Sequence, residues 1–196
     1  MIKDFFLKRQ NIRQHLRNIR FNLASREKIQ AANLLAQYSV NFSPIVKAEH
    51  ITIFLSIDGE IDTYPLINQL WKKNKKVYLP IIHPFAKDHL LFSRYTLKTK
   101  IILNKLNFLE PILDITQIIT LDLIDIMFIP LVAFDIRGYR IGMGKGFYDR
   151  TLKNWQKYNF LPIGIAYDCQ LVNNIPESTW DVQLPIILTP SKIWHW

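Results

Sequence analysis

The sequence predicts an α/β domain with a mostly parallel sheet, and three observations support this. Apolar runs of strand length alternate with segments of helical periodicity along the chain. The strand-like runs, such as "IMFIP" at 126–130, are almost continuously apolar, which is typical of strands that are covered on both faces. A length of 196 residues and a hydrophobic content of 49% suit one domain with a full core. Residues 1–196 are therefore expected to form a single domain.

The first segment is expected to be an amphipathic helix with two adjacent stripes. The apolar stripe is Ile12, Leu16, Ile19 and Leu23, and the basic stripe is Arg9, Arg13, Arg17 and Arg20. One edge should pack against the domain while the other presents a row of guanidinium groups. A second helix is expected from Ser25, a plausible N-cap, to about Tyr38.

The remaining elements alternate strands and helices. The expected strands are 50–56, 76–80, 90–97, 126–130, 161–168 and 185–190, and the expected helices are 64–73 and one that ends near Tyr158. Ligands of such sheets bind beyond the carboxyl ends of the strands. The loop "IDGEID" at 57–62 and a glycine-rich stretch after 130 both follow strands, so the two could face one crevice.

Composition narrows the class of protein. The net charge of +9 favours nucleic acid or small anionic ligands as partners, although a bias toward Lys, Asn and Ile could also produce it. A single cysteine, Cys169, excludes an internal disulfide and suggests a cytoplasmic protein. The N-terminus is too charged for a secretory signal, and the longest apolar run is too short to span a membrane. The five histidines form no zinc-ligand spacing with Cys169.

Four of the six glycines lie in "RGYRIGMGKGFYDR" at 137–150. Glycine lets backbone N–H groups form an anion nest, and a helix start beyond it would add its positive dipole end. Arg140 and Lys145 would add full charges, so the stretch predicts a phosphate-bearing ligand. Asp149 would repel a phosphate unless Mg²⁺ lay between them. Neither the P-loop nor the dinucleotide fingerprint fits, and a tight connector with incidental charge is the alternative.

The longer segment "FDIRGYRIGMGKGFYDR" at 134–150 closely resembles the signature of the 5-formyltetrahydrofolate cyclo-ligase family. Ile141 stands where leucine is usual, and Phe147 replaces the first tyrosine of a pair. "RQNIR" at 9–13, "FLSIDGEIDT" at 54–63 and "WDVQLP" at 180–185 resemble three further motifs of the family in the same order. The resemblance thus covers nearly the whole chain.

The resemblance implies a three-layer αβα sandwich of the kind found in ribose-5-phosphate isomerase and CoA transferases. It also implies ATP- and Mg²⁺-dependent conversion of 5-formyltetrahydrofolate to 5,10-methenyltetrahydrofolate, with ADP and phosphate released. In the family's mechanism the formyl oxygen attacks the γ-phosphate of ATP, and N10 then attacks the activated carbon. The implied partners are these two small molecules, without nucleic acid or membrane, and the chain is expected to be a monomer.

The resemblance also assigns residues. Arg140 and Lys145 would be catalytic, and Asp149 and Asp181 would bind Mg²⁺. The expected ATP-binding residues are Arg9, Arg13, Arg140, Ile141, Gly142, Met143, Gly144, Lys145, Gly146, Phe147 and Tyr148. The expected folate-binding residues are Leu55, Glu60, Met143, Gly144, Lys145, Gly146 and Phe147. A carboxylate at Glu60 suits the N–H groups of a pterin ring.

Each assignment has an alternative. Arg9 and Arg13 could be a solvated helix face, and Arg17 and Arg20 fit that description better than they fit ligands. Glu60 could be an ordinary loop carboxylate, Asp181 a turn cap and Leu55 plain core, and the tryptophans are expected to be packing residues. Two other functions compete: a basic nucleic-acid-binding protein, for which no motif appears, and an ATP-using enzyme with another formyl or amide substrate.

Overall fold

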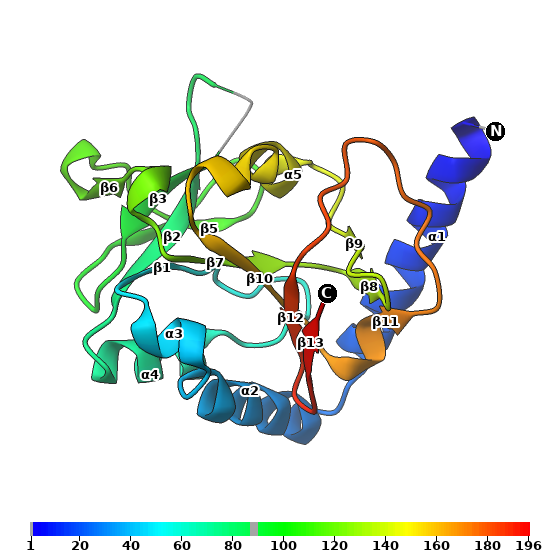
Figure 1. The fold of residues 1–196 in the computed structure, drawn as a ribbon, viewed down its shortest axis with the longest axis horizontal. Helices are drawn as coiled ribbons and strands as arrows, with labels where there is room; N and C mark the ends of the chain where they lie inside the picture. The colour runs from blue at the N-terminus through cyan, green and yellow to red at the C-terminus, as the bar shows by residue number, and fades with distance from the viewer. Residues whose placement is uncertain (1, 87–89) are drawn as a thin grey trace.

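An eight-stranded mixed sheet forms the centre of the computed structural model, which describes residues 2–86 and 90–196 (Figure 1). The five central strands run parallel, and the antiparallel pairings lie toward the two edges. In spatial order the strands are β13 (Ile193–His195), β12 (Ile186–Leu188), β10 (Leu161–Ile165), β7 (Ile126–Pro130), β1 (His50–Thr52), β2 (Lys76–Ile82), β3 (Leu90–Arg94) and β6 (Ile118–Ile119). The prediction of a mostly parallel sheet is confirmed.

Helices lie on both faces of this sheet (Figure 1). They are α1 (Ile2–Phe21), α2 (Ser25–Ser39), α3 (Ser43–Lys47), α4 (Tyr64–Lys72) and α5 (Phe147–Leu152). Figure 1 shows α2, α3 and α4 together on one face and α5 on the other, with α1 standing at one end of the molecule. Among the described residues, no helix combines the length and the apolar character needed to cross a membrane.

The central strands divide their side chains between two apolar clusters. In β7, Ile126 and Phe128 belong to the cluster beneath α2 and α4, whereas Met127 and Ile129 belong to the cluster on the α5 side. In a strand successive side chains point to opposite faces, so a strand covered on both sides needs apolar residues at every position. This is the physical reason for the continuous apolar run at 126–130.

Two smaller units lie beside the main sheet. A three-stranded sheet consists of β11 (Leu171–Val172), β8 (Ala133–Asp135) and β9 (Arg140–Ile141), and a hairpin consists of β4 (Ile101–Leu103) and β5 (Leu109–Pro111). Leu16 of α1 packs in a third apolar cluster that includes Ala133 and Ile141. This packing fixes α1 beside the glycine-rich stretch, most of which follows β9 in the chain.

Several expected boundaries are wrong. The N-cap of α2 is Ala24 rather than Ser25, and the strand expected over 50–56 ends at Thr52. The helix expected to reach Tyr158 ends at Leu152, and a separate 3-10 turn follows at Trp155–Lys157. The side chains of Trp155 and Tyr158 contact Phe160, so tertiary packing interrupts the helical pattern there.

Candidate functional site

The turn that precedes the glycine-rich stretch is organised by Asp135, at the end of β8. Its carboxylate is fully buried and accepts hydrogen bonds from the backbone N–H groups of Arg137, Tyr139 and Ile175. The Arg137 guanidinium also donates to it at 2.8–3.1 Å. These bonds hold the connection from β8 to β9, so that the following residues emerge at a defined place.

The glycine-rich stretch then bends sharply before α5. Gly144 and Gly146 have φ values of +92° and +71°, which L residues with a side chain rarely adopt. A Cβ placed on Gly146 would also lie 2.6 Å from Nη1 of Arg150. A Cβ placed on Gly142 would meet no atom of residues 2–86 and 90–196 within 4 Å, so among these residues the space beside its backbone is open. The stretch has the form of a cradle that a ligand can enter.

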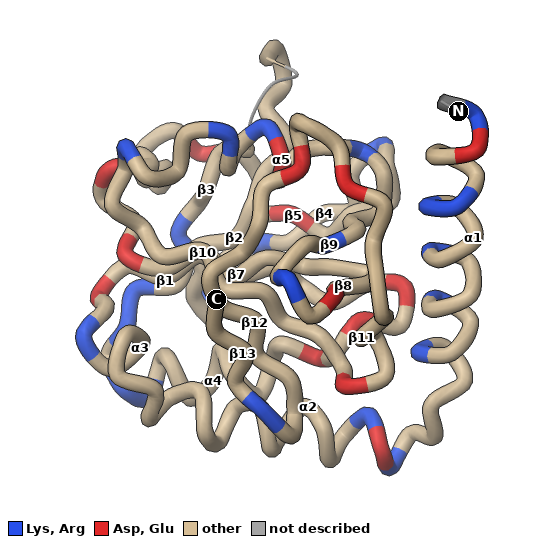
Figure 2. The backbone as a smooth tube through the Cα atoms, turned by 45° about the vertical axis from the view of Figure 1, so that its right-hand side comes forward, with Lys and Arg blue, Asp and Glu red and all other residues tan. Residues whose placement is uncertain are grey.

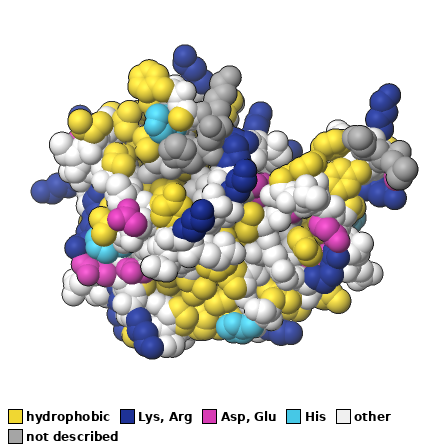
Figure 3. Space-filling view, turned by 45° about the horizontal axis from the view of Figure 1, so that its top comes forward, with side chains coloured by type: hydrophobic (Ala, Val, Ile, Leu, Met, Phe, Trp, Pro, Cys, Tyr) yellow, Lys and Arg dark blue, Asp and Glu magenta, His cyan; other side chains and the backbone are white. Residues whose placement is uncertain are grey.

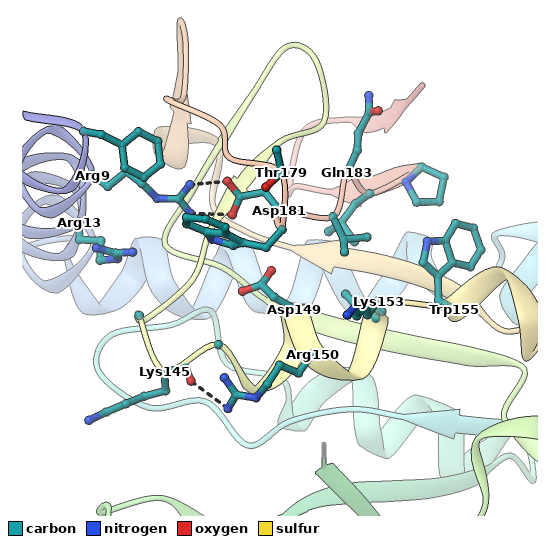
Figure 4. A pocket seen from close by; sticks show the side chains of 18 of the residues that line it. Arg9, Arg13, Lys145, Asp149, Arg150, Lys153, Trp155, Thr179, Asp181 and Gln183 are labelled. Carbon is teal, nitrogen blue, oxygen red and sulfur yellow. Dashed lines mark hydrogen bonds and ion pairs between the residues drawn. The ribbon is translucent and has the colours of Figure 1, made fainter. Parts of the chain in front are cut away.

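Two cavities meet at this stretch. A wide cleft of about 900 Å³ lies between α1, α5 and the segment that contains Asp181, and Figure 4 shows it from close by. A narrower cavity of about 150 Å³ lies toward the sheet and includes Leu55, Glu60, Phe147 and Tyr148 in its walls. Among the described residues, six line both cavities: Arg9, Arg13, Gly144, Lys145, Gly146 and Asp149. The crevice expected to join the 57–62 loop to the glycine-rich stretch is therefore present.

Basic side chains surround the cleft. Figure 2 shows that most of the Lys and Arg positions of α1 lie on the side of the helix that faces the rest of the molecule. In Figure 3, Lys and Arg side chains gather beside the hollow between the body and the projecting end of α1. Besides Arg9, Arg13 and Lys145, Arg150 and Lys153 line this cleft. Neither of the last two was among the expected site residues, although Arg150 is the last residue of the motif and Lys153 lies three residues after it.

Arg140 is buried at the base of the site. It donates to the Val182 carbonyl, and its Nη2 donates to Oδ1 of Asp149 at 2.6 Å. Burial lowers the pKa of its guanidinium, and the charges of Asp149 and Asp181 oppose that effect. Arg140 therefore joins the glycine-rich stretch to the C-terminal segment and holds one oxygen of Asp149.

Arg9 and Asp181 form a buried ion pair between segments 172 residues apart. Both oxygens of Asp181 accept hydrogen bonds from the Arg9 guanidinium, and the Ser178 N–H donates to one of them at 2.8 Å. Figure 4 shows the pair at the edge of the cleft, with Asp149 below it. Asp181 is thus neither a simple turn cap nor an open carboxylate, and Arg9 is not a solvated helix face.

Arg13 contacts the glycine-rich stretch directly. Its Nε donates to the Gly142 carbonyl at 2.8 Å, and the residue lines both cavities. Its two terminal nitrogens form no hydrogen bond with the described residues. Burial lowers the pKa of Arg13, and the nearby charge of Arg9 lowers it further. A cation repelled in this way favours an anionic ligand that would neutralise both charges.

The two aspartates differ in how well they fit a divalent cation. Asp149 is partly exposed in the cleft, and only its Oδ1 is held by the described residues, so its second oxygen could coordinate Mg²⁺. Asp181 would have to release Arg9 first. No group of three His, Cys, Asp or Glu side chains within 2–86 and 90–196 forms a ready-made metal site, and His89 lies outside the described residues.

Glu60 and its neighbours form the inner part of the narrow cavity. Desolvation there raises the pKa of the Glu60 carboxyl to about 7, and the charge of Arg20 opposes the rise. Burial also raises the pKa of the Tyr148 phenol, so it is neutral at physiological pH. Leu55 lines the same cavity while it packs against the core, so the two interpretations of Leu55 are compatible.

The other residues expected to bind ATP do not line the wide cleft. Gly142, Met143, Phe147 and Tyr148 line only the narrow cavity, although they were expected to contact ATP. The Ile141 side chain is buried in the third apolar cluster and lines neither cavity. The β4–β5 hairpin adds a wall of Phe108, Leu109 and Glu110, which the sequence patterns did not indicate.

Two other expectations about side chains are wrong. Arg20 was expected on an exposed helix face, but it is completely buried and pairs with Asp58. Trp180 was expected to be a packing residue, but it is 60% exposed and lines the wide cleft together with Trp155 and Trp196. Arg20 is buried because it pairs with Asp58, which lies 38 residues away in the sequence. Trp180 lies at the edge of the cleft, where no other side chain covers its ring among the described residues.

Comparisons with known proteins agree with the resemblance. The sequence pattern of the 5-formyltetrahydrofolate cyclo-ligase family matches residues 7–190. A 5-formyltetrahydrofolate cyclo-ligase of Escherichia coli strain K12 is 45% identical over 92% of this chain and 100% of the relative. One of Haemophilus influenzae is 48% identical over 92% of this chain and 97% of the relative, and one of Mus musculus is 27% identical over 92% and 90%.

Solved structures give the same result for the fold. The NMR structure of Aquifex aeolicus 5,10-methenyltetrahydrofolate synthetase matches with a TM-score of 0.80 over 95% of this chain and 92% of that chain, at 24% identity. A 5,10-methenyltetrahydrofolate synthetase from Mycoplasma pneumoniae matches with a TM-score of 0.73 over 93% and 98%, also at 24% identity. At this identity, the likeness concerns the fold alone.

Proposed function

The chain belongs to the 5-formyltetrahydrofolate cyclo-ligase family, and we propose that it converts 5-formyltetrahydrofolate to 5,10-methenyltetrahydrofolate with ATP as co-substrate. One observation supports this most directly. Two cavities of unequal width share the glycine-rich stretch as a common wall. A reaction that moves a phosphoryl group from one ligand to another needs this arrangement, because the two ligands must meet end to end.

The wide basic cleft suits ATP, and the narrow cavity suits the pterin. Arg9, Arg13, Lys145, Arg150 and Lys153 give the cleft a charge that favours phosphates. The narrow cavity is lined mostly by apolar side chains and contains Glu60, whose carboxylate can accept N–H groups of a pterin ring. The transferring phosphoryl group would then lie beside Gly144, Lys145 and Gly146.

The chemistry requires activation of a poor nucleophile. The formyl oxygen attacks the γ-phosphorus, a new P–O bond forms, and the bond to the bridging oxygen of ADP breaks. N10 then attacks the formyl carbon and loses its proton, and the C–O bond breaks as inorganic phosphate leaves. Because little covalent chemistry falls to the protein, positioning and charge neutralisation carry the catalysis.

In this proposal the residues divide the work. Lys145 is exposed at the boundary of the two cavities and neutralises charge on the transferring phosphoryl group. Arg140 lies behind it, holds Asp149, and adds its own charge to the site. Arg13 uses its terminal nitrogens for phosphate while its Nε holds the Gly142 carbonyl. Tyr148 and Leu55 close the narrow cavity around the substrate.

Magnesium belongs to the proposal as well. Asp149 would hold it, and Asp181 would join only after its ion pair with Arg9 opens. The ion would neutralise phosphate charge beside a carboxylate that otherwise repels it. Arg9, once released from Asp181, would be available for the nucleotide.

The finer predictions from the sequence stay proposals. We propose that residues 1–196 act as one domain, a three-layer sandwich related to ribose-5-phosphate isomerase and the CoA transferases. We also propose a cytoplasmic monomer that does not bind nucleic acid. The inward orientation of Arg9, Arg20 and Arg140, all buried, supports the last point, because buried guanidinium groups cannot contact a duplex.

A direct assay tests the proposed function. Purified protein is mixed with 5-formyltetrahydrofolate, ATP and Mg²⁺, and the near-ultraviolet absorbance of the methenyl product is followed. A rise that requires all three components is the expected result. An ATP-binding protein that gives no rise would instead favour another formyl or amide substrate.

The protonation of Glu60 should control the affinity for folate. With a pKa of about 7, the carboxyl is ionised above neutral pH and protonated below it. Pterin N–H groups bind the ionised form, so the folate KM is expected to rise as the pH falls below 7. In Glu60→Gln the KM should be about tenfold higher at pH 8 and nearly independent of pH. Steady-state kinetics from pH 6 to 8.5 measure this, with the KM for ATP as the control. Identical profiles in the two proteins would refute the role of Glu60.

Asp149 should determine the magnesium requirement. Asp149→Asn removes the charge but keeps the size, so the Mg²⁺ concentration for half-maximal turnover should rise on the order of tenfold. A Mg²⁺ titration at saturating ATP and folate measures this. Asp122→Asn, which changes an aspartate outside both cavities, is the control. An unchanged titration would remove Asp149 from the metal site.

A further inference from the structure

Arg20, near the end of α1, is a fully buried cation with a specific set of acceptors. Its Nε donates to the Asp58 carbonyl at 3.1 Å, and its Nη2 donates to Oδ2 of Asp58 at 2.9 Å. Its Nη1 donates to the Leu131 carbonyl at 3.3 Å, just after β7. A buried charge is unfavourable unless it is paired and hydrogen-bonded, and every nitrogen of this guanidinium has such a partner. Arg20 thus connects α1, the 57–60 turn and the end of a central strand.

Asp58 is held from two directions. Arg17 donates from Nε and Nη2 to its two carboxylate oxygens at 2.6 and 2.8 Å, on the solvent side. Arg20 holds the same residue from the buried side through both its side chain and its carbonyl. The φ of Asp58 is +51°, an uncommon value that Asp tolerates better than most residues. These contacts stabilise a backbone shape that the residue alone would seldom adopt.

The shape of this turn determines where Glu60 lies. The Ile57 N–H donates to Oε2 of Glu60 at 3.2 Å, and the Glu60 N–H donates to the Ile57 carbonyl at 2.9 Å. These two hydrogen bonds join the first and last residues of the turn, Ile57 and Glu60, and Asp58 lies between them in the chain. Ile57 and Glu60 both line the narrow cavity.

We propose that Arg20 is a positioning residue for substrate recognition: by binding Asp58 it holds the 57–60 turn so that the Glu60 carboxylate faces the narrow cavity. This inference rests on the proposed function, in which that cavity receives the pterin ring. Arg20 does not line either cavity, so it acts through Asp58 and Glu60 rather than by contact with substrate.

The charges around Glu60 make the proposal testable. The groups that face it are Arg20 from α1, Asp58 from its own turn, Tyr148 from α5 and Tyr167 after β10. Burial raises the pKa of both tyrosines, to about 12 for Tyr167, so neither carries charge near neutral pH. Among these groups only two ions remain. Arg20 lowers the pKa of Glu60, and Asp58 raises it.

The two members of this ion pair should therefore change Glu60 in opposite directions. In Arg20→Gln the pKa of Glu60 should rise above its wild-type value, whereas in Asp58→Asn it should fall, since asparagine also tolerates the positive φ. The matched control is Arg17→Gln, which removes the exposed arginine from the same carboxylate and should leave the pKa of Glu60 unchanged. A role in folding stability alone would not produce opposite signs.

Carbon-13 NMR of labelled glutamate carboxyl groups measures this pKa without any ligand, and the Glu60→Gln spectrum identifies the signal. The folate KM at pH 7 is the second measurement. It should be about fivefold higher in Arg20→Gln, because a tenfold weaker acid at position 60 would be about one-tenth ionised at pH 7 where the wild type is about half ionised, and kcat should change less than about twofold. Arg20→Lys, which keeps the charge but cannot bridge Asp58 and Leu131, should keep the pKa near that of the wild type while still raising the KM.

The outcomes separate the two proposals. If the wild type shows no turnover, the proposed function fails, yet the NMR titrations still test the position and surroundings of Glu60. If the wild type is active but Arg20→Gln and Asp58→Asn shift Glu60 in the same direction or not at all, the role of Arg20 is refuted. Should Arg20→Gln fail to fold, Arg20→Lys and Asp58→Asn decide the matter by the KM and by the downward shift.

Discussion

Replacing Lys145 with alanine is expected to lower kcat by roughly two to three orders of magnitude without changing the fold. Lys145 is exposed at the boundary of the two cavities, and its ammonium group makes no hydrogen bond or ion pair with the described residues. Its removal therefore costs no native contact. In the transition state, however, the phosphoryl group would lose a full positive charge at the point of transfer. Turnover under saturating substrates, together with circular dichroism, measures the two effects.

A lysine outside both cavities provides the control. Lys72 ends α4 on the opposite face of the sheet and is also exposed, so Lys72→Ala changes the net charge equally. Turnover of Lys72→Ala should stay within about twofold of the wild type. If Lys145→Ala retained comparable turnover, Lys145 would have no role in the chemical step.

Replacing Arg140 with glutamine is expected to reduce both turnover and stability. Arg140 is buried and donates to the Val182 carbonyl and to Asp149. Glutamine is shorter, so Asp149 would lose its partner and the Val182 carbonyl would lose its donor. Breaking a fully buried pair on one side typically lowers the free energy of unfolding by about 3–5 kcal/mol. Because the Asp149 side chain is 30% exposed, a smaller loss of about 2 kcal/mol is expected here. Urea denaturation followed by tryptophan fluorescence measures this loss.

The exposed neighbour on the same stretch serves for comparison. Arg150 donates to the Lys145 carbonyl at 3.1 Å and lies over the Phe147 ring, but it remains in solvent. Arg150→Gln should lower the free energy of unfolding by less than about 1 kcal/mol. Equal stability of Arg140→Gln and Arg150→Gln would mean that Arg140 has no structural role at the base of the site.

These two predictions depend on different sources of information. A phosphate cradle in the glycine-rich stretch could be predicted from the sequence because the chemistry is local: glycines, cations and an aspartate lie within a few residues. The different environments of Lys145 and Arg140 could not be predicted from the sequence. Five positions apart in one motif, the two side chains share a charge, yet one is exposed and the other buried, because β9 pairs with β8 and directs Arg140 toward Val182.

The strand at 126–130 was predicted with its observed ends, because a strand covered on both faces must be apolar throughout. The end of α5 was predicted wrongly. Beyond Leu152 the chain forms a 3-10 turn instead of more helix, and Trp155 and Tyr158 contact Phe160 there. The hairpin that walls the narrow cavity was also missed. It has only three residues in each strand, too few for a clear alternation.

What the sequence by itself determined is the α/β class, the mostly parallel sheet, the family, and the stretch around which the site is built. Each depends on periodicity or on motifs of adjacent residues, which are local properties of the chain. Only the tertiary structure decided that Arg20 is buried against Asp58, that Arg9 pairs with Asp181, and that two cavities share one wall. Those contacts join segments 38 to 172 residues apart. The two ion pairs depend on how α1 packs against the rest of the domain, through Leu16 on Ala133 and Ile141, and no local pattern of residues specifies that packing.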